Sequence, residues 1–187
     1  MKIVALGDSI TYGFPFSNRE SWTTQLAREK SCEVINQGIN GDFTFGMLSR
    51  FSKDVLHFKP SHVIIMGGTN DAAAFIELEQ VKANFISMIE KSRGDSIIPV
   101  LGLPIPLLYP QEEHTLAAYR DWLRSYSAEN GILTIDFHKP FSERVEGGMH
   151  WDLYADMGHP NIDGYKLMGE TVVGFFSALT EYRRKKG

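Results

Sequence analysis

Four polar segments of the sequence contain the residue types that acyl transfer requires. Ser9 supplies a hydroxyl, His159 an imidazole and Asp156 a carboxylate. Gly41 and Asn70 belong to two further segments, where a backbone N–H or a side-chain amide can donate a hydrogen bond. A nucleophile, a base, an acid that orients the base and donors for a developing oxyanion are together what nucleophilic acyl transfer needs.

The position of each residue within its segment fits these roles. Ser9 stands where a predicted strand turns toward a helix, so its N–H can be a free donor at a helix start while its Oγ faces outward. Asp156 stands three residues before His159, and in a loop this spacing lets a carboxylate accept from Nδ1 and leaves Nε2 free for the serine. Gly41 lets a backbone N–H approach a substrate because no Cβ intervenes.

These segments need a scaffold that brings them to one edge. Short apolar runs alternate with longer segments of helical period, which is typical of a parallel sheet covered by helices on both faces. The expected strands are 2–6, 33–36, 62–66, 96–101 and 132–135, and the expected helices are 20–30, 45–58, 78–93, 113–129 and 162–182. The pattern predicts an α/β fold, a flavodoxin-like three-layer α/β/α sandwich with a five-stranded parallel sheet, whose ligands bind beyond the carboxyl ends of the strands.

The four segments together resemble the GDSL or SGNH hydrolase family of serine esterases, lipases and acylhydrolases. They read Gly7-Asp8-Ser9-Ile10, Gly38-Ile-Asn-Gly41-Asp42, Gly67-Gly68-Thr69-Asn70-Asp71 and Asp156-Met-Gly-His159-Pro160, and the resemblance covers essentially the whole chain. Ile10 stands where the family name has leucine, which is a conservative departure.

This resemblance implies a role for each of the five residues. Ser9 is expected to be the nucleophile, with Asp156 and His159 completing a catalytic triad. Gly41 and Asn70 are expected to join the Ser9 N–H as the donors of an oxyanion hole.

The residues next to these five have less specific expected roles. Asp8 and Asp71 are expected to support the site by hydrogen-bonding local backbone and bracing their loops. Gly38 competes with Gly41 for the oxyanion role. Four other histidines have no matching carboxylate spacing and are not candidates: His57, His62, His114 and His138.

The late segment also leaves alternatives open. Asp152 competes with Asp156 as the carboxylate that orients His159, although the family resemblance favours Asp156. His150, Asp152, Asp156 and His159 are also four potential zinc or manganese ligands within ten residues, which a metal-dependent hydrolase could use. This alternative explains none of the upstream segments, so we expect no metal and no cofactor. A non-enzymatic flavodoxin-like binding domain is the weaker alternative, since no Gly-x-Gly-x-x-Gly loop is present.

Composition restricts the partners and the compartment. The 187 residues contain no linker or repeat, so we expect one hydrolase domain over 1–187. Nineteen Lys and Arg against 23 Asp and Glu give a net charge of −4, which disfavours nucleic acid as a partner. A single cysteine and a first apolar stretch too short for a signal peptide predict a cytoplasmic protein, and no segment is long enough for a membrane span.

We therefore predict a serine esterase or acylhydrolase that acts on small or short-chain carboxylic esters through an acyl-enzyme. Apolar residues flank the four segments and could line a pocket for an acyl or aryl group, or could equally pack the loops. They are Phe14, Phe16, Phe43, Phe45, Phe75, Leu107, Leu108, Tyr109, Trp151, Tyr154 and Met157.

Overall fold

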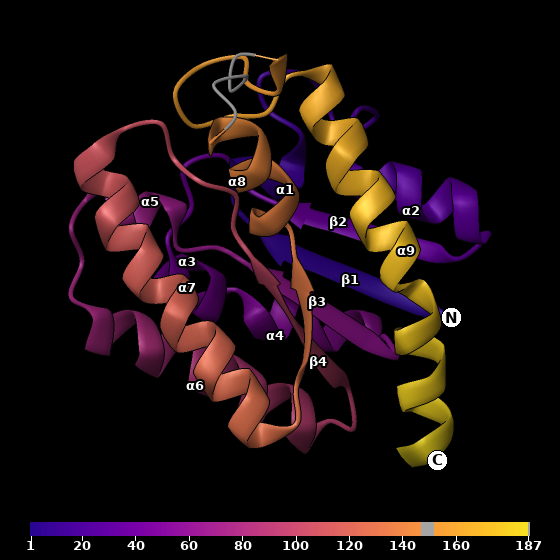
Figure 1. The fold of residues 1–187 in the computed structure, drawn as a ribbon. Helices are drawn as coiled ribbons and strands as arrows, with labels where there is room; N and C mark the ends of the chain where they lie inside the picture. The colour runs from indigo at the N-terminus through magenta and orange to yellow at the C-terminus, as the bar shows by residue number, and fades with distance from the viewer. Residues whose placement is uncertain (147–151, 187) are drawn as a thin grey trace.

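The computed structural model describes residues 1–146 and 152–186. Its five strands are β1 (Lys2–Gly7), β2 (Glu33–Gly38), β3 (His62–Met66), β4 (Ile98–Leu103) and β5 (Leu133–Asp136). They form one parallel sheet in the order β2-β1-β3-β4-β5 (Figure 1). All five predicted strands and the flavodoxin-like sheet are confirmed: the bounds of β3 are as predicted, and the ends of the other strands differ from the predicted ones by at most two residues.

Helices cover both faces of this sheet. One face carries α3 (Thr44–Ser49), α4 (Phe51–Asp54), η1 (Leu56–Phe58), α5 (Thr69–Ala73), α6 (Leu78–Gly94) and α7 (Pro110–Asn130). The other face carries α1 (Ser9–Tyr12), α2 (Trp22–Lys30), α8 (His138–Glu146) and α9 (Ile162–Lys186). The three predicted layers are therefore present.

The strands divide their side chains between two cores because successive residues of a strand point to opposite faces. In β1, Val4 belongs to the core under α6 and α7, whereas Ile3 belongs to the core under α2 and α9. Phe85 of α6 and Met168 of α9 are fully buried in these two cores, as their helical spacing predicts. Burying a side chain of this size contributes about 1.5–3 kcal/mol.

The predicted helix 45–58 is wrong, because the segment is divided into α3, α4 and η1. Arg50 interrupts it with φ −94° and ψ 1°. Its guanidinium donates to Asp42 Oδ2 at 2.7 Å, to Asp54 Oδ2 at 3.0 Å and to Gly7 O at 2.9 Å. Two partly buried ion pairs and the bond to Gly7 O fix Arg50 against the end of β1. The helix is therefore interrupted at this residue.

Three helices lie outside the predicted helical ranges: α5, α8 and α1, of which α1 begins at Ser9, where a helix start was expected. The helices α1 and α5 have four and five residues, too few to show a helical period. The helix α8 follows Asp136, whose Oδ1 accepts a hydrogen bond from Lys139 N–H at 2.9 Å. Pro140 lies in its first turn, where proline is tolerated.

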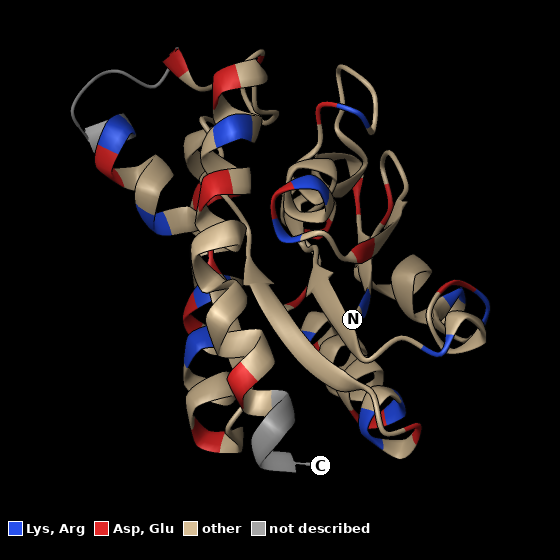
Figure 2. Cartoon of the chain, turned by 90° about the vertical axis from the view of Figure 1, so that its right-hand side faces the viewer, with Lys and Arg blue, Asp and Glu red and all other residues tan. Residues whose placement is uncertain are grey.

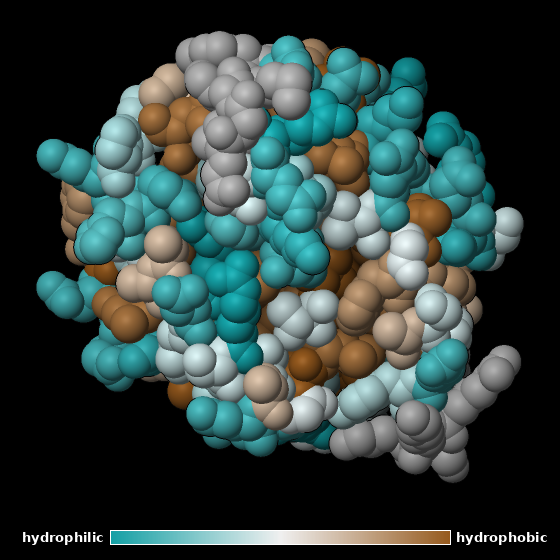
Figure 3. Space-filling model, in the orientation of Figure 1, coloured by the Kyte–Doolittle hydropathy of each residue, from teal (hydrophilic) through white to brown (hydrophobic). Residues whose placement is uncertain are grey.

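The surface is of mixed character. Lys and Arg are mixed with Asp and Glu along the helices (Figure 2). Hydrophilic residues cover much of the face in Figure 3, with hydrophobic residues showing between them. Among the helices of the described ranges, none is long and apolar enough to cross a membrane.

Candidate active site

Ser9 is the first residue of α1, at the carboxyl edge of the sheet. Asp8 caps this helix, because its Oδ1 accepts a hydrogen bond from Ile10 N–H at 2.9 Å. Gly13 ends it with φ 112°, a left-handed conformation in which glycine is not strained. The turn from β1 into α1 therefore fixes the backbone on both sides of Ser9, whose exposure is 6%.

Ser9, His159 and Asp156 form a continuous row of hydrogen-bonded groups. Ser9 Oγ lies 3.0 Å from His159 Nε2, and His159 Nδ1 lies 2.9 Å from Asp156 Oδ2. A carboxylate only accepts hydrogen bonds, so Nδ1 carries a proton and donates to Asp156. In the neutral imidazole Nε2 is then the acceptor for the Ser9 hydroxyl.

Asp156 and His159 belong to residues 152–161, which we call the dyad loop. The Asp156 side chain is half exposed, and its Oδ1 also accepts from Gly158 N–H and His159 N–H, both at 2.8 Å. Partial burial acts to raise the pKa of Asp156, but the bonds from Gly158 N–H and from His159 outweigh it and lower that pKa below its ordinary value. The carboxylate is therefore charged at neutral pH.

The sequence left two alternatives open for this loop: Asp152 as the carboxylate that orients His159, and a metal site. The His159 ring pairs with Asp156, whereas Asp152 uses its backbone carbonyl to accept from Asn161 Nδ2 at 3.0 Å. His150 of the alternative metal set lies outside the described residues. Within the described ranges, no three His, Cys, Asp or Glu side chains are grouped so that they could hold a metal ion.

Asn70 lies in the first turn of α5, after β3, and Gly41 lies in the loop after β2. Asn70 Nδ2 donates one hydrogen bond to Asp42 O at 2.9 Å, so the second proton of this amide is left for another acceptor. Gly41 has φ 74°, and a Cβ added to it would have no atom within 4 Å. The loop therefore presents the Gly41 backbone to open space.

Gly38 has a different part in the same loop. Its N–H donates to Asn36 Oδ1 at 2.9 Å, so this amide is already used. A Cβ on Gly38 would lie 2.1 Å from Tyr12 N, so glycine is needed there for the close approach of two backbones. In the part of the chain that the structure describes, Gly41 N–H donates to no acceptor, and the geometry favours Gly41 over Gly38 as an oxyanion donor.

Buried polar contacts hold these loops from beneath. Asp71 is 1% exposed and accepts from Thr44 N–H at 3.0 Å and from Thr44 Oγ1 at 2.6 Å. Asn84 Nδ2 then donates to Thr44 Oγ1 at 2.9 Å. Burial raises the pKa of Asp71 despite its bonds from Thr44, and burial also raises the pKa of Asp8 to about 6.

Arg50 is the residue in this region that the sequence analysis missed. By bonding both Asp42 and Gly7 O, it joins the loop of Gly41 to the strand end that precedes Ser9. Asp54, four residues after Arg50, was a sequence signal for a local ion pair. Nothing in the spacing indicated the contacts with Asp42 or Gly7.

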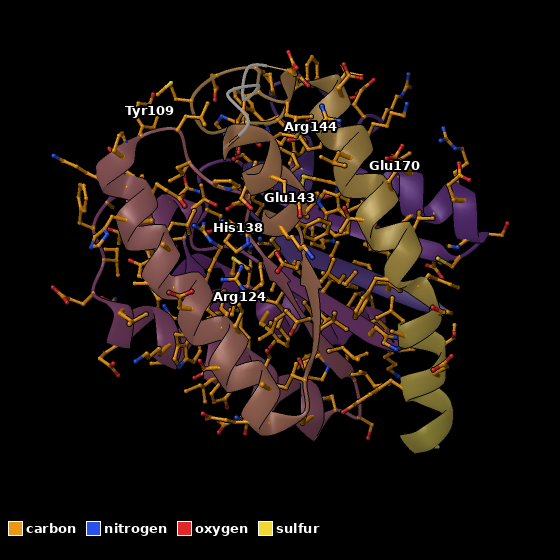
Figure 4. The ribbon with its side chains drawn as sticks, in the orientation of Figure 1. Tyr109, Arg124, His138, Glu143, Arg144 and Glu170 are labelled. Carbon is orange, nitrogen blue, oxygen red and sulfur yellow. The ribbon has the colours of Figure 1, made fainter. Side chains whose placement is uncertain are left out.

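The apolar residues around the site differ in burial, and Phe14, Phe43, Leu108 and Met157 are of intermediate exposure. Leu107 and Tyr154 are 7% and 4% exposed, so they pack the loops. Four others are exposed, at 38–56%: Phe16, Phe45, Phe75 and Tyr109, the last of which lies at the start of α7 (Figure 4). The Phe14 ring meets His159 edge-on, with 4.7 Å between ring centroids. Trp151 lies outside the described residues.

His138 is one of the histidines that were not candidates, and charged groups surround it. It lies beside Arg124, whose Nη2 donates to His138 Nδ1 at 3.3 Å (Figure 4). Burial, together with the charges of Arg120 and Arg124, lowers the pKa of His138 to about 4. Its hydrogen-bonding partner and its place on α8 separate it from Ser9.

Comparison with known proteins identifies the family of this chain. The model of the GDSL-like lipase/acylhydrolase family matches residues 5–167. The uncharacterized lipoprotein YqeF of Bacillus subtilis is 35% identical over 130 residues, which are 63% of this chain and 54% of YqeF, so the chain spans about half the length of that relative. Esterase TesA of Pseudomonas aeruginosa is 26% identical over 176 residues, covering 91% of this chain and 85% of TesA.

A solved structure extends the likeness to the fold. A G-D-S-L family protein from Desulfitobacterium hafniense superposes with a TM-score of 0.83 and 35% identity, covering 92% of this chain and 98% of that one. The family match includes the segments of Ser9, Gly41, Asn70 and His159. This chain therefore belongs to the GDSL-like lipase/acylhydrolase family of ester hydrolases, as its four segments predict.

Proposed function

We propose that this protein hydrolyses small or short-chain carboxylic esters in two steps, with Ser9 as the nucleophile of a Ser-His-Asp triad. The observation that carries the proposal is the hydrogen-bonded row from Ser9 Oγ through His159 to Asp156. In support, His159 Nε2 lies within hydrogen-bond distance of Ser9 Oγ, and the Asp156 carboxylate accepts from the other ring nitrogen of His159.

In the first step Ser9 Oγ attacks the ester carbonyl carbon while His159 Nε2 takes the hydroxyl proton. His159 then gives this proton to the leaving alcohol, which departs and leaves an acyl group on Ser9. In the second step His159 takes a proton from water, the resulting hydroxide attacks the acyl carbon, and Ser9 regains its proton as the carboxylic acid leaves. Asp156 stabilises the imidazolium in both steps.

Three donors are proposed to bind the oxyanion: Ser9 N–H, Gly41 N–H and the second Nδ2 proton of Asn70. In support, Gly41 faces open space and Asn70 is oriented by its bond to Asp42 O. Each such donor contributes on the order of 3 kcal/mol to the transition state. The buried contacts of Asp71 and Arg50 keep these donors in place before the substrate binds, so little reorganisation accompanies the reaction.

The preference for small esters rests on the openness of the described site. The His159 and Asp156 side chains are 27% and 49% exposed, so the reacting groups lie near the surface. The exposed rings of Phe45, Phe75 and Tyr109 offer apolar contact without enclosing a long chain. A series of p-nitrophenyl esters tests this: turnover should be fastest on acetyl and butyryl esters, and fastest turnover on long acyl chains would overturn the preference.

The remaining features are also proposals. Because both cores run along the whole five-stranded sheet, we take residues 1–187 as one hydrolase domain. The net charge of −4 and the mixed charges in Figure 2 favour a small-molecule partner over nucleic acid. A cytoplasmic location stays a prediction, since one relative is named a lipoprotein.

Covalent labelling tests the proposed nucleophile. The protein is incubated with a fluorophosphonate in the presence of EDTA, and the adduct is located by intact mass and peptide sequencing. We expect one adduct on Ser9, absent from heat-denatured protein and from Ser9→Ala, and no esterase activity in that variant. Near-wild-type turnover of Ser9→Ala would refute the mechanism, and hydrolysis that EDTA suppresses would instead favour the metal alternative.

A further inference from the structure

The dyad loop is joined by hydrogen bonds to the β4–α7 loop, residues 104–109. Tyr154 OH donates to Pro106 O at 2.6 Å, and Leu108 N–H donates to Met157 O at 2.8 Å. Tyr154 is 4% exposed, so its bond is shielded from water. These two bonds fix the backbone on both sides of the β4–α7 loop's central residue, Leu107.

Leu107 adds a packing contact to these bonds. Its side chain lies against Gly158, where an added Cβ would be 3.2 Å from Leu107 Cδ2. Gly158 stands between Asp156 and His159 in the chain, and its N–H is one of the donors to Asp156. A shift of Leu107 would therefore be transmitted directly to the part of the dyad loop that orients the imidazole.

Glu113 of α7 holds Leu107 from the other side. Its Oε2 accepts from Leu107 N–H at 2.7 Å, and its Oε1 forms an ion pair with Arg120 Nη2. The Arg120 side chain is 2% exposed, one of the largest fully buried side chains among the described residues. The carboxylate of Glu113 is thus fixed by a buried cation two turns further along the same helix.

Stability alone does not account for this ion pair, in which Arg120 is buried and Glu113 is 26% exposed. Removing the Arg120 charge from water is costly, and well-packed apolar residues often give equal or greater stability. Arg120 Nη1 is buried, and it finds no hydrogen-bond partner in the described part of the chain. What an apolar pair could not provide is an acceptor held at a fixed position for Leu107 N–H.

We propose that Glu113 is a positioning residue for the acid–base pair: held by Arg120, it fixes Leu107 and so places the dyad loop where His159 reaches Ser9. This inference rests on the proposed function of Ser9 and His159. The contact between Ser9 Oγ and His159 Nε2 is 3.0 Å long, and a displacement of about 1 Å at such a contact lowers the rate by roughly 100-fold.

Two double variants test the role of the acceptor. Glu113→Gln/Arg120→Met and Glu113→Leu/Arg120→Met both remove both charges, and they differ in whether residue 113 offers a carbonyl oxygen to Leu107 N–H. We expect the Gln variant to retain kcat within about threefold of wild type. We expect the Leu variant to lose kcat by about tenfold or more with KM within about twofold, because substrate contacts are untouched.

The controls separate positioning from loss of stability. Ile89→Val truncates a buried side chain of α6, away from the β4–α7 loop, and should lower Tm while leaving kcat unchanged. If the Leu variant does not fold, Tyr154→Phe replaces it, since this change removes the bond to Pro106 O and should lower kcat at constant KM. Equal kcat in the two double variants, or unchanged kcat in Tyr154→Phe, would overturn the proposal.

Fluorophosphonate labelling distinguishes failure of the Glu113 proposal from failure of the proposed esterase mechanism. Wild-type protein that labels at Ser9, together with double variants of equal kcat, rejects the role of Glu113 and keeps the esterase mechanism. Wild-type protein that neither labels nor hydrolyses esters rejects the mechanism and this inference with it. A labelling rate that falls in the Leu variant and recovers in the Gln variant supports both.

Discussion

The two halves of the site are held in different ways. Ser9, Gly41 and Asn70 follow strands β1, β2 and β3, and buried polar groups bond the backbone around them. Asp156 and His159 stand on the dyad loop, with side chains 49% and 27% exposed, and their loop is joined to another loop rather than to a strand. The sheet therefore places the proposed nucleophile and the proposed oxyanion donors, while loop contacts place the proposed base.

The carboxyl groups of the two halves differ in burial and in the direction of their pKa shifts. Asp8 and Asp71 are each 1% exposed, and burial raises the pKa of both. Asp156 is half exposed, and hydrogen bonds from the chain around it outweigh partial burial and lower its pKa. Asp8 and Asp71 are thus buried where they brace loops, whereas the charged form of Asp156 is stabilised by backbone donors beside the His159 ring.

The largest expected loss of kcat comes from a substitution in the pair of Asp156 and His159. In His159→Ala the serine has no base, and kcat should fall by roughly 10⁴- to 10⁶-fold. Because His159 is 27% exposed, Tm should change little, which thermal unfolding would check. His138→Ala is the matched control and should keep kcat; a near-wild-type kcat in His159→Ala would remove this residue from the mechanism.

The strand-end half of the site consists of Ser9, Gly41 and Asn70. Removing one proposed donor from it should lower kcat less than removing His159 does. Asn70→Ala should lower kcat by about 10²- to 10³-fold with little change in KM, because an oxyanion contact forms mainly in the transition state. Steady-state kinetics on a soluble acetyl ester measures both constants. A change confined to KM would mean that Asn70 contacts the bound ester and not the oxyanion.

The strand-end half was also the part that the sequence predicted best. Apolar, β-branched runs such as residues 2–6 and 62–66 predict buried parallel strands, and the carboxyl ends of such strands share one edge. That rule alone places Ser9 and Asn70 near each other. Asp156 and His159 could be paired by their spacing of three residues, since both belong to one loop.

The features that escaped prediction depend on partners distant in the sequence. The break at Arg50 follows from contacts with Asp42 and Gly7, which no periodicity indicates. Gly38 and Gly41 are the same residue type in one segment, and the close approach of Tyr12 N to Gly38 distinguishes them. The bond from Leu107 to Glu113 likewise needs the turn between β4 and α7 to exist first.

The pH dependence of stability sharpens the comparison of the carboxyl groups. The pKa of Asp8 rises from 3.8 to about 6 on folding, so its contribution to stability is fully present below pH 3.8 and is lost as pH rises through 6. This shift of about 2 units corresponds to about 3 kcal/mol. His159, Asp71 and Tyr165 are the titratable groups whose charges act on Asp8.

Asp8→Asn removes this titration and keeps an Oδ1 for Ile10 N–H. Above pH 7 the variant should therefore gain stability over wild type, by up to about 3 kcal/mol, and this gain should vanish near pH 4. Urea unfolding at pH 4, 5.5, 7 and 8.5 measures the difference. A difference that stays constant over this range would show that Asp8 does not titrate between its unfolded and folded values.

The smallest expected effect is that of Gly41→Ala, for which the loss of stability can be separated from the loss of kcat by comparison with Gly131→Ala. Gly41 and Gly131 have φ 74° and 60°, and a Cβ at either would have no atom within 4 Å. Replacing either by alanine should therefore lower the free energy of unfolding by about 1 kcal/mol, through backbone strain alone. Gly131 ends α7 away from the strand-end loops, so Gly131→Ala should keep kcat.

Gly41→Ala should differ from this control in activity. The proposed ester oxygen would bind to the Gly41 N–H, and a methyl group on the adjoining Cα should hinder its approach and lower kcat by up to about tenfold, which is about 1.4 kcal/mol. Urea unfolding and ester kinetics on the two variants separate the effects. Equal kcat in both would mean that Gly41 serves the turn alone, and that the oxyanion relies on Ser9 N–H and Asn70.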